Sequence, residues 1–376
     1  MKSRSIQIAT PFTGVEELSA LAGPLERGWL TQGPEVGEFE RLFAERHMVP
    51  HALATTSCTT ALQLALAALE IGPGDEVIVP AFTWVATANV VRLSGATPVF
   101  VDVDESTFNL DLAQVAGMLT RSTKAIIPVH LFGLCADVDE LESMLPESVV
   151  VIEDAACAAG AEMRGRPAGS LGDAAAFSFH PRKIITTGEG GMLTTRSDAV
   201  AVRAEMLRNH GASISEEMRH SGPQPYLLPD FDDTGFNFRM TDLQGAVGAV
   251  QMGRLDALLA ERRRRADWYS EQLSDVGWLQ LPSVPRDFAH SWQSYITIVH
   301  EDRSPAPRNE IMAKLHAAGI GTRPGTHAVP TLGAYRGTAA ACPVAERLQA
   351  TTMAIPLHNK MDDDDYEFVA NALRSL

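Results

Sequence analysis

Lys183 lies between two short apolar segments, and its surroundings could make its side-chain amine reactive. Residues 174–179 predict a buried strand before it, and residues 191–195 predict another strand after a glycine-rich turn. A lysine held between such elements is partly desolvated, which favours the neutral, nucleophilic amine at neutral pH. Taken alone, an ordinary loop lysine would explain this segment as well.

A carboxylate at the end of another predicted strand could act together with this lysine. The apolar run 149–154 closes on Asp154. Pyridoxal phosphate requires both groups, because a lysine forms its Schiff base and an acid faces its pyridine nitrogen. The lysine, the acid and the glycines together therefore predict a pyridoxal phosphate site, with Lys183 and Asp154 as its catalytic residues.

Three other segments would suit the phosphate and the ring of this cofactor. Residues 55–62 form a hydroxyl-rich turn that opens a helical stretch, where free backbone N–H groups would favour a phosphate. Simple N-capping by Ser57 or Thr59 is the alternative. Trp84 follows a predicted strand and could stack on a flat ring, although a core position explains it too. Residues 235–239 place a polar pair between aromatic residues, or form a plain loop.

Composition excludes several other classes of protein. The chain has 376 residues, enough for two domains, and its formal charge of −16 argues against a nucleic-acid partner. Its four scattered cysteines form no metal-ligand spacing, so we expect no metal site and a reducing compartment. No apolar run approaches the ~18 residues of a membrane-spanning helix. We therefore expect a soluble, cytoplasmic protein with no membrane partner.

Predicted strands and helices alternate over the first two-thirds of the chain. This alternation favours an α/β fold, in which helices cover both faces of a mostly parallel sheet. The predicted strands are 76–81, 97–103, 125–132, 149–155, 174–179 and 191–195, with helices at 59–69 and 83–93.

A long helix predicted over 241–273 marks a change of pattern. It starts at Thr241 with a sequence that resembles a capping box. We expect it to join a large cofactor-binding domain, residues 1–250, to a smaller C-terminal α+β domain, residues 251–376. The elements predicted in this second domain are a strand at 294–299 and helices at 309–318, 343–352 and 363–373.

Nearly the whole chain resembles the DegT/DnrJ/EryC1/StrS aminotransferases. These enzymes are a branch of the aspartate aminotransferase-like, fold type I, pyridoxal phosphate enzymes, and most of them install amino groups on nucleotide-linked sugars. The resemblance is carried by ordered matches, which are residues 28–34, 72–77, 95–99, 153–156, 172–173, the Lys183 segment, 208–211, 235–239 and 357–358.

The resemblance implies roles for the residues around the cofactor. Lys183 would hold pyridoxal 5'-phosphate and later move a proton, with pyridoxamine phosphate as the intermediate form. Asp154 would pair with the pyridine nitrogen and Trp84 would stack on the ring. Two positions depart from the family pattern. Cys58 replaces a usual glycine, and Cys157 replaces a usual glutamine, so a hydrogen bond to the ring hydroxyl is weaker or replaced.

The resemblance also implies how the phosphate is bound and how the chains assemble. Thr59, Thr60 and Ser178 would bind the phosphate within one subunit. Asn237 would reach it from the second subunit, because the active sites of this family lie at a dimer interface. We therefore expect a homodimer with shared active sites.

The activity implied is transfer of an amino group from glutamate, which leaves 2-oxoglutarate, to a keto sugar. The acceptor would be a dTDP-, UDP- or GDP-linked keto-deoxyhexose, used to make an amino sugar for a natural product or a surface polysaccharide. Candidates for substrate contact are His180, Arg239, Arg323 and His327. His180 and the loop around Arg323 could instead be structural.

Two other functions stay open at this point. A keto-cyclitol or another ketone without a nucleotide could be the acceptor. The chain could also be a pyridoxal phosphate-binding regulator without turnover, although an intact lysine, acid and phosphate cradle would then lack a purpose. Related dehydratases carry histidine in place of the lysine, so Lys183 argues against that chemistry.

Overall fold

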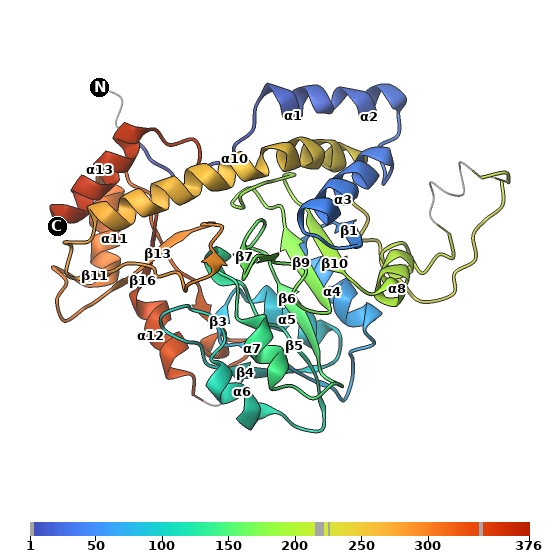
Figure 1. Ribbon diagram of the computed structural model, residues 1–376, viewed down its shortest axis with the longest axis horizontal. Coiled ribbons are helices and arrows are strands. Elements are labelled where there is room, and N and C mark those ends of the chain that lie inside the picture. The colour runs from blue at the N-terminus through green and yellow to red at the C-terminus, as the bar shows by residue number, and fades with distance from the viewer. Residues whose placement is uncertain (1–3, 215–221, 225, 338–340) are drawn as a thin grey trace.

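A seven-stranded sheet forms the centre of the computed structural model, which describes residues 4–214, 222–224, 226–337 and 341–376. Its strands are β1 (His51–Thr55), β2 (Glu76–Pro80), β4 (Thr97–Val101), β5 (Thr123–Ile126), β6 (Val150–Asp154), β9 (Ala174–Ser178) and β10 (Gly191–Thr195). They are arranged in the order β1-β10-β9-β6-β5-β2-β4. The pairs from β9 to β4 are parallel, whereas β10 is antiparallel to both of its neighbours. The predicted mostly parallel sheet is confirmed (Figure 1).

Helices cover both faces of this sheet. On one face lie α4 (Cys58–Ala68), α5 (Ala86–Leu93) and α8 (Asp198–Arg208), and on the other lie α3 (Pro34–Arg46), α6 (Leu112–Met118), α7 (Val138–Ser143) and α10 (Asp242–Gln272). Successive residues of a strand point to opposite faces. Thus in β9 Ala174 and Ala176 join the first core, while Ala175 and Phe177 join the second. Because helices cover both faces of the sheet, its strands are buried and consist mainly of apolar residues.

Several predicted elements have different bounds in the structure. The strand expected over 125–132 already ends at Ile126, and residues 131–133 form a 3-10 turn. The helix expected from residue 83 begins at Ala86, because Phe82–Thr83 forms β3 and pairs with β15 (His327–Ala328). Strand β1 was not predicted. Its alanines have low strand preference, and it is held by pairing with β10 at the edge of the sheet.

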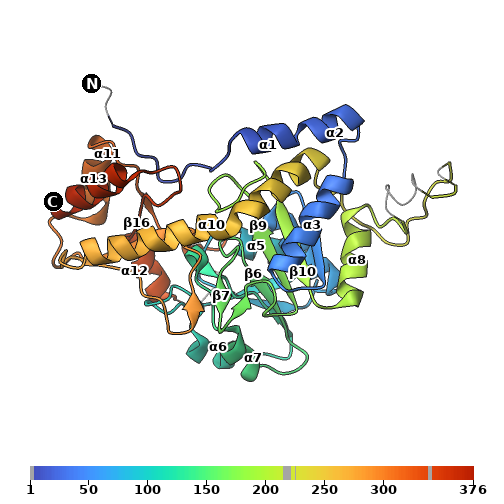
Figure 2. The ribbon, with the colours of Figure 1, turned by 45° about the horizontal axis from the view of Figure 1, so that its top comes forward.

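Helix α10 runs from the large sheet to the C-terminal part of the chain, as Figure 2 shows. The predicted capping box is present, because Thr241 accepts from the Gln244 amide and the Gln244 side chain accepts from the Thr241 amide. Beside its far end lies an antiparallel sheet in the order β11-β13-β16-β14. Its strands are β11 (Leu279–Gln280), β13 (Tyr295–Val299), β16 (Thr352–Ile355) and β14 (Arg323–Pro324).

This C-terminal part has its own apolar core, which includes Tyr269, Tyr295 and Tyr366. Its helices are α11 (Arg308–Ala317), α12 (Pro343–Thr351) and α13 (Asp363–Arg374). However, Ile296 and Ile298 of β13 also contact the core of the large sheet. The division at residues 250 and 251 stays a prediction.

The remaining elements are short. They are helices α1 (Val15–Ala20) and α2 (Ala22–Arg27), strands β7 (Glu162–Met163), β8 (Arg166–Pro167) and β12 (Phe288–Ala289), and 3-10 turns at Leu131–Gly133 and Val329–Thr331. Within the described part of the chain, no helix combines the length and the apolar character needed to cross a membrane.

Candidate active site

Asp154 lies at the carboxyl end of β6, where ligands of open parallel sheets usually bind. Only 5% of the residue is exposed. The Thr87 hydroxyl donates a 2.7 Å hydrogen bond to Oδ2, and the Ala156 amide donates one of 3.2 Å to Oδ1. Burial raises the pKa of Asp154, while the hydrogen bonds and the charge of Lys183 oppose that rise. A buried carboxylate held in this way suits a cationic partner from a ligand.

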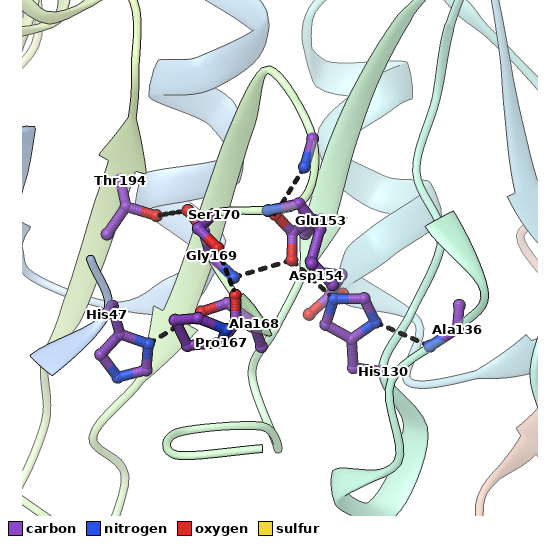
Figure 3. Close-up of polar contacts among 12 residues, drawn as sticks. His47, His130, Ala136, Glu153, Asp154, Pro167, Ala168, Gly169, Ser170 and Thr194 are labelled. Carbon is purple, nitrogen blue, oxygen red and sulfur yellow. Dashed lines mark hydrogen bonds and ion pairs between the residues drawn. The ribbon is translucent and has the colours of Figure 1, made fainter. Parts of the chain in front are cut away.

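The neighbouring residue, Glu153, points to the other face of the sheet and anchors this strand end (Figure 3). Its carboxylate is fully buried and accepts hydrogen bonds from His130 Nε2 and from the amides of Gly169, Leu171 and Gly172, all between 2.7 and 2.8 Å. Burial alone would raise the pKa of Glu153, but these hydrogen bonds outweigh it and leave the pKa lowered. The network therefore fixes the backbone that carries Asp154.

Lys183 lies in the turn between β9 and β10. Its backbone N–H donates to the His180 carbonyl at 2.8 Å, and its side chain is half-buried. Nζ donates a hydrogen bond of 3.2 Å to Sγ of Cys157, the residue three positions after Asp154. The ionisation of Cys58 responds to the charges of Asp154, Lys183 and Cys157, so the two thiols, the amine and the acid share one environment.

The N-terminus of α4 faces this environment. Ser57 caps the helix by accepting from the Thr60 amide, and the Thr60 hydroxyl accepts from the Ser57 amide. The amides of Cys58 and Thr59 lie in the same first turn, where no intrahelical acceptor exists for them. Cys58 is the first residue of α4, so its backbone is helical. A side chain at this position, where a glycine is usual, therefore causes no backbone strain.

A close contact between this helix end and β10 explains one of the glycines after Lys183. A Cβ atom built on Gly191 would lie 2.3 Å from the backbone carbonyl carbon of Ser57. Only glycine can therefore occupy position 191 while β10 and the start of α4 keep this separation. The cap of α4 and the strand that follows the lysine turn are thus held together by their backbones.

Trp84 and His327 are brought together by the pairing of β3 with β15. The Trp84 side chain is 62% exposed, and its ring centre lies 5.6 Å from that of His327. The indole is therefore not a core residue. The backbone carbonyl of Trp84 accepts a 3.3 Å hydrogen bond from the hydroxyl of Thr87, the residue that also holds Asp154.

The other predicted contact residues lie around the same edge of the sheet. Ser178 is the last residue of β9. Its hydroxyl accepts a 3.4 Å hydrogen bond from the His180 amide. Burial lowers the pKa of His180, which favours its neutral form. Asn237 is exposed, and the next carbonyl, of Phe238, accepts from the Thr56 amide at 3.0 Å. Its segment therefore lies beside the helix cap of the same chain.

Two arginines line a small cavity near Cys157. Arg182 and Arg323 share this cavity with Gln293, whose side chain donates to the Arg182 carbonyl at 3.0 Å. Burial lowers the pKa of Arg323, the charge of Cys157 opposes this effect, and Arg182 adds to it. Among the described residues, no carboxylate contributes to the pKa of Arg323. Arg239, in contrast, is half-buried and donates to the Asn209 side chain.

Some members of the site were not identified from the sequence. Thr87 was not predicted as a site residue, although its position three residues after Trp84 could have indicated it. Gln293 and Arg182 come together only through the tertiary fold, so no local pattern indicates them. Within the described residues, no group of three or more His, Cys, Asp or Glu side chains could hold a metal ion.

The residues present fit pyridoxal phosphate. An acid with a raised pKa, a half-buried lysine and the open N-terminus of an eleven-residue helix meet at one end of a parallel sheet. These features, on this fold, define a fold type I pyridoxal phosphate enzyme.

Residues 12–374 match the DegT/DnrJ/EryC1/StrS aminotransferase family, and the chain belongs to that family. It is a pyridoxal phosphate-dependent aminotransferase.

Relatives match the chain over almost its full length. GDP-perosamine synthase of Caulobacter vibrioides is 40% identical over 98% of this chain and 97% of its own length. The PLP form of Spr1654 from Streptococcus pneumoniae has a TM-score of 0.91 at 30% identity, covering 99% of this chain and 98% of that one. DesV of S. venezuelae, solved with a ketimine intermediate, has a TM-score of 0.86 at 34% identity, covering 96% and 94%.

Proposed function

We propose that this enzyme transfers an amino group from glutamate to a keto sugar carried on a nucleotide, and so makes an amino sugar. The observation that carries the proposal is the shared environment of Lys183, Asp154 and the N-terminus of α4, in a chain similar along its length to GDP-perosamine synthase. Because that relative is named for a GDP-linked sugar, a GDP-linked keto-deoxyhexose is the first acceptor to test. dTDP- and UDP-linked keto sugars follow.

Each catalytic residue has a distinct task in this proposal. Bound pyridoxal phosphate supplies an electron sink and carries the amino group from one substrate to the other. Nζ of Lys183 takes the proton from the Cα of the donor and later returns a proton to the former carbonyl carbon of the acceptor. Asp154, oriented by Thr87, would pair with the pyridine nitrogen and keep it protonated.

Other residues bind and orient. The first turn of α4, with Thr59 and Thr60, and the hydroxyl of Ser178 are proposed to bind the phosphate, since helix N-termini favour anions. Trp84 is proposed to contact the ring, which its exposure supports. Cys157 occupies the position from which the family contacts the ring hydroxyl.

Arg182 and Arg323, the two arginines near Cys157, are proposed to bind an anionic group of a substrate. Arg323 is not neutralised by a carboxylate within the described residues, and Arg182 adds a second charge beside it. Guanidinium groups pair with carboxylates and phosphates in a bidentate way. We therefore assign a carboxylate of glutamate or a phosphate of the sugar nucleotide to this place. His180, Arg239 and His327 stay candidates for further substrate contacts.

We also propose that the enzyme is a homodimer, with Asn237 reaching the phosphate of the partner's site. After α8, the described part of the chain extends away from the body of the molecule before it reaches α10 (Figures 1 and 2). Tyr226, Leu228 and Phe231 on this segment are 76%, 86% and 57% exposed. Large apolar side chains on a projection favour burial against a second copy.

Absorbance spectroscopy with stepwise substrates tests the proposed activity. With pyridoxal phosphate, we expect a visible band in the wild type that glutamate bleaches with release of 2-oxoglutarate. A GDP-linked keto sugar should then restore the band and yield an amino sugar. Lys183→Ala should do neither, whereas Lys124→Ala, which removes an exposed lysine, should match the wild type.

Three results would contradict parts of the proposal. A band that glutamate leaves unchanged would refute glutamate as the donor. Amination of a keto-cyclitol, with no turnover of any nucleotide sugar, would refute the acceptor class. Binding of the cofactor without any half-reaction would favour a regulatory protein.

A further inference from the structure

Cys157 combines access from solvent with contact to a reactive amine. All four cysteines of the chain lie in the described part, and Cys58, Cys135 and Cys342 are buried whereas Cys157 is half-buried. Sγ of Cys157 lies 3.2 Å from Nζ of Lys183. Two nucleophilic atoms in direct contact can be linked if one of them is first oxidised.

The backbone holds both residues of this pair in place. The carbonyl of Cys157 accepts a 3.0 Å hydrogen bond from the Ser291 hydroxyl. The backbone N–H of Lys183 donates one of 2.8 Å to His180. The contact between thiol and amine is therefore set by two anchored backbones, and only side-chain rotation is needed to shorten it.

We propose that Cys157 and Lys183 form a peroxide-sensitive modification site, in which oxidation of the thiol captures the amine in a sulfur–nitrogen bond. Hydrogen peroxide first transfers one oxygen to Sγ, so that its O–O bond breaks, a sulfenic acid forms and one water leaves. The neutral Nζ of Lys183 then attacks Sγ. The S–O bond breaks, and hydroxide leaves with the proton lost by nitrogen as a second water. Sulfur gives up two electrons, which reduce the peroxide.

The modification would switch off the proposed activity reversibly. It rests on the proposed function only in that Lys183 is the catalytic amine, since an amine bonded to sulfur can neither hold the cofactor nor move a proton. An added thiol reductant breaks the sulfur–nitrogen bond and restores both side chains. Because bound pyridoxal phosphate engages Lys183, the reaction belongs to states in which the amine is free.

Cys58 offers a competing reaction for the oxidised sulfur. A disulfide between Cys58 and Cys157 would have the same mass as the sulfur–nitrogen link. However, Cys58 is buried and burial raises the pKa of its thiol well above the usual value, which makes it a poor nucleophile. The half-buried Lys183 already contacts Cys157 and is the better placed group.

Peptide mapping of the full-length enzyme after mild hydrogen peroxide tests this site without relying on activity. In cofactor-free protein we expect a mass loss of about 2 Da and a linked pair of the peptides that carry Cys157 and Lys183. Dithiothreitol should reverse the link and restore an activity that had fallen at least about tenfold. Pyridoxal phosphate should suppress the link.

Three variants separate the outcomes. Cys58→Gly should still form the link, because Cys58 takes no part in it. Cys157→Ser should form none, and Lys183→Ala should instead gain about 16 or 32 Da at Cys157. The proposal is wrong if Cys157 stays reduced, if it stops at oxygen adducts in the wild type, or if it joins Cys58. A link that forms in a protein without transamination would preserve this proposal and refute the proposed function.

Discussion

The hydroxyl of Thr87 donates a 2.7 Å hydrogen bond to Oδ2 of Asp154, across the gap between helix α5 and the end of strand β6. Both residues are buried. A hydrogen bond to a buried carboxylate stabilises the charged form, which is the form that can pair with a protonated pyridine. We therefore propose Thr87 as a positioning residue, which would act on the cofactor through Asp154.

Asp154→Asn should weaken cofactor binding while stabilising the cofactor-free protein. Folding raises the pKa of Asp154, so its contribution to stability is present at low pH and is lost as the pH rises through that pKa. At pH 7.5 we expect the neutral amide to increase stability, because it carries no charge whose burial must be offset. Loss of a charged hydrogen bond, worth about 1.5–3 kcal/mol, should weaken cofactor affinity roughly tenfold to a hundredfold.

Thermal unfolding and cofactor titration measure these two effects. The stability gain of Asp154→Asn should shrink as the pH approaches 4. Thr87→Val should weaken cofactor binding about fivefold to tenfold, and Thr87→Ser should restore it. An unfolding temperature of Asp154→Asn below that of the wild type at pH 7.5 would contradict the argument.

Trp84→Ala should affect cofactor affinity much more than stability. The side chain is 62% exposed, so its removal should change the free energy of unfolding by less than about 0.5 kcal/mol. An aromatic contact with the ring is worth about 0.5–1.5 kcal/mol, or roughly twofold to twelvefold in affinity. Fluorescence titration with pyridoxal phosphate measures this change, and Trp84→Phe should recover most of the loss. Equal affinity of all three proteins would exclude the stacking role.

Glu153→Gln should destabilise the protein by about 3–5 kcal/mol, because an amide nitrogen would face donors that now point at a carboxylate. Urea unfolding measures the loss, with Glu162→Gln on half-exposed β7 as the control. The pKa of Glu153 is lowered by folding, so its stabilisation is present at neutral pH and is lost as the pH falls below about 4.5. Stability of the wild type should therefore fall more steeply with acid than that of the variant. A loss under about 1 kcal/mol would refute the anchoring role.

Leu228→Asp and Phe231→Asp should convert the proposed dimer into monomers. Burying an unpaired charge in an apolar contact costs about 2 kcal/mol or more, so each change should weaken the dimer at least about thirtyfold. Sedimentation velocity over a range of concentrations measures this effect. Val284→Asp, on the loop after β11, should leave the dimer intact. A monomeric wild type, or variants that stay dimeric, would overturn the assignment of this segment.

The central sheet could be predicted because its strands are short apolar runs between helical patterns. β10 was predicted with its observed bounds, and the start of α10 was indicated by the Thr241 capping box. β1 escaped prediction because its five residues mix histidine and alanine, and because its partner β10 lies far along the chain. Pairing between distant segments overrides such weak local preferences.

Candidate site residues could be chosen from the sequence where the chemistry requires one residue type. Lys183 and Asp154 could be singled out for that reason, and the structure brings them into one environment. The network of Glu153 with His130 and three backbone amides could not be predicted, because hydrogen bonds to the backbone leave no pattern of residue types. The contact between Cys157 and Lys183 also depends on tertiary packing alone.

The pairing of β3 with β15 limits the order in which a newly made chain can fold. Thr83, next to Trp84 in the chain, pairs with His327, which the ribosome adds long after Thr83. The acid, the lysine and the capped helix are all translated well before that moment. A nascent chain can therefore form this pair only after His327 has been made, and a chain that stops before β15 carries the proposed catalytic residues without the contact between Trp84 and His327.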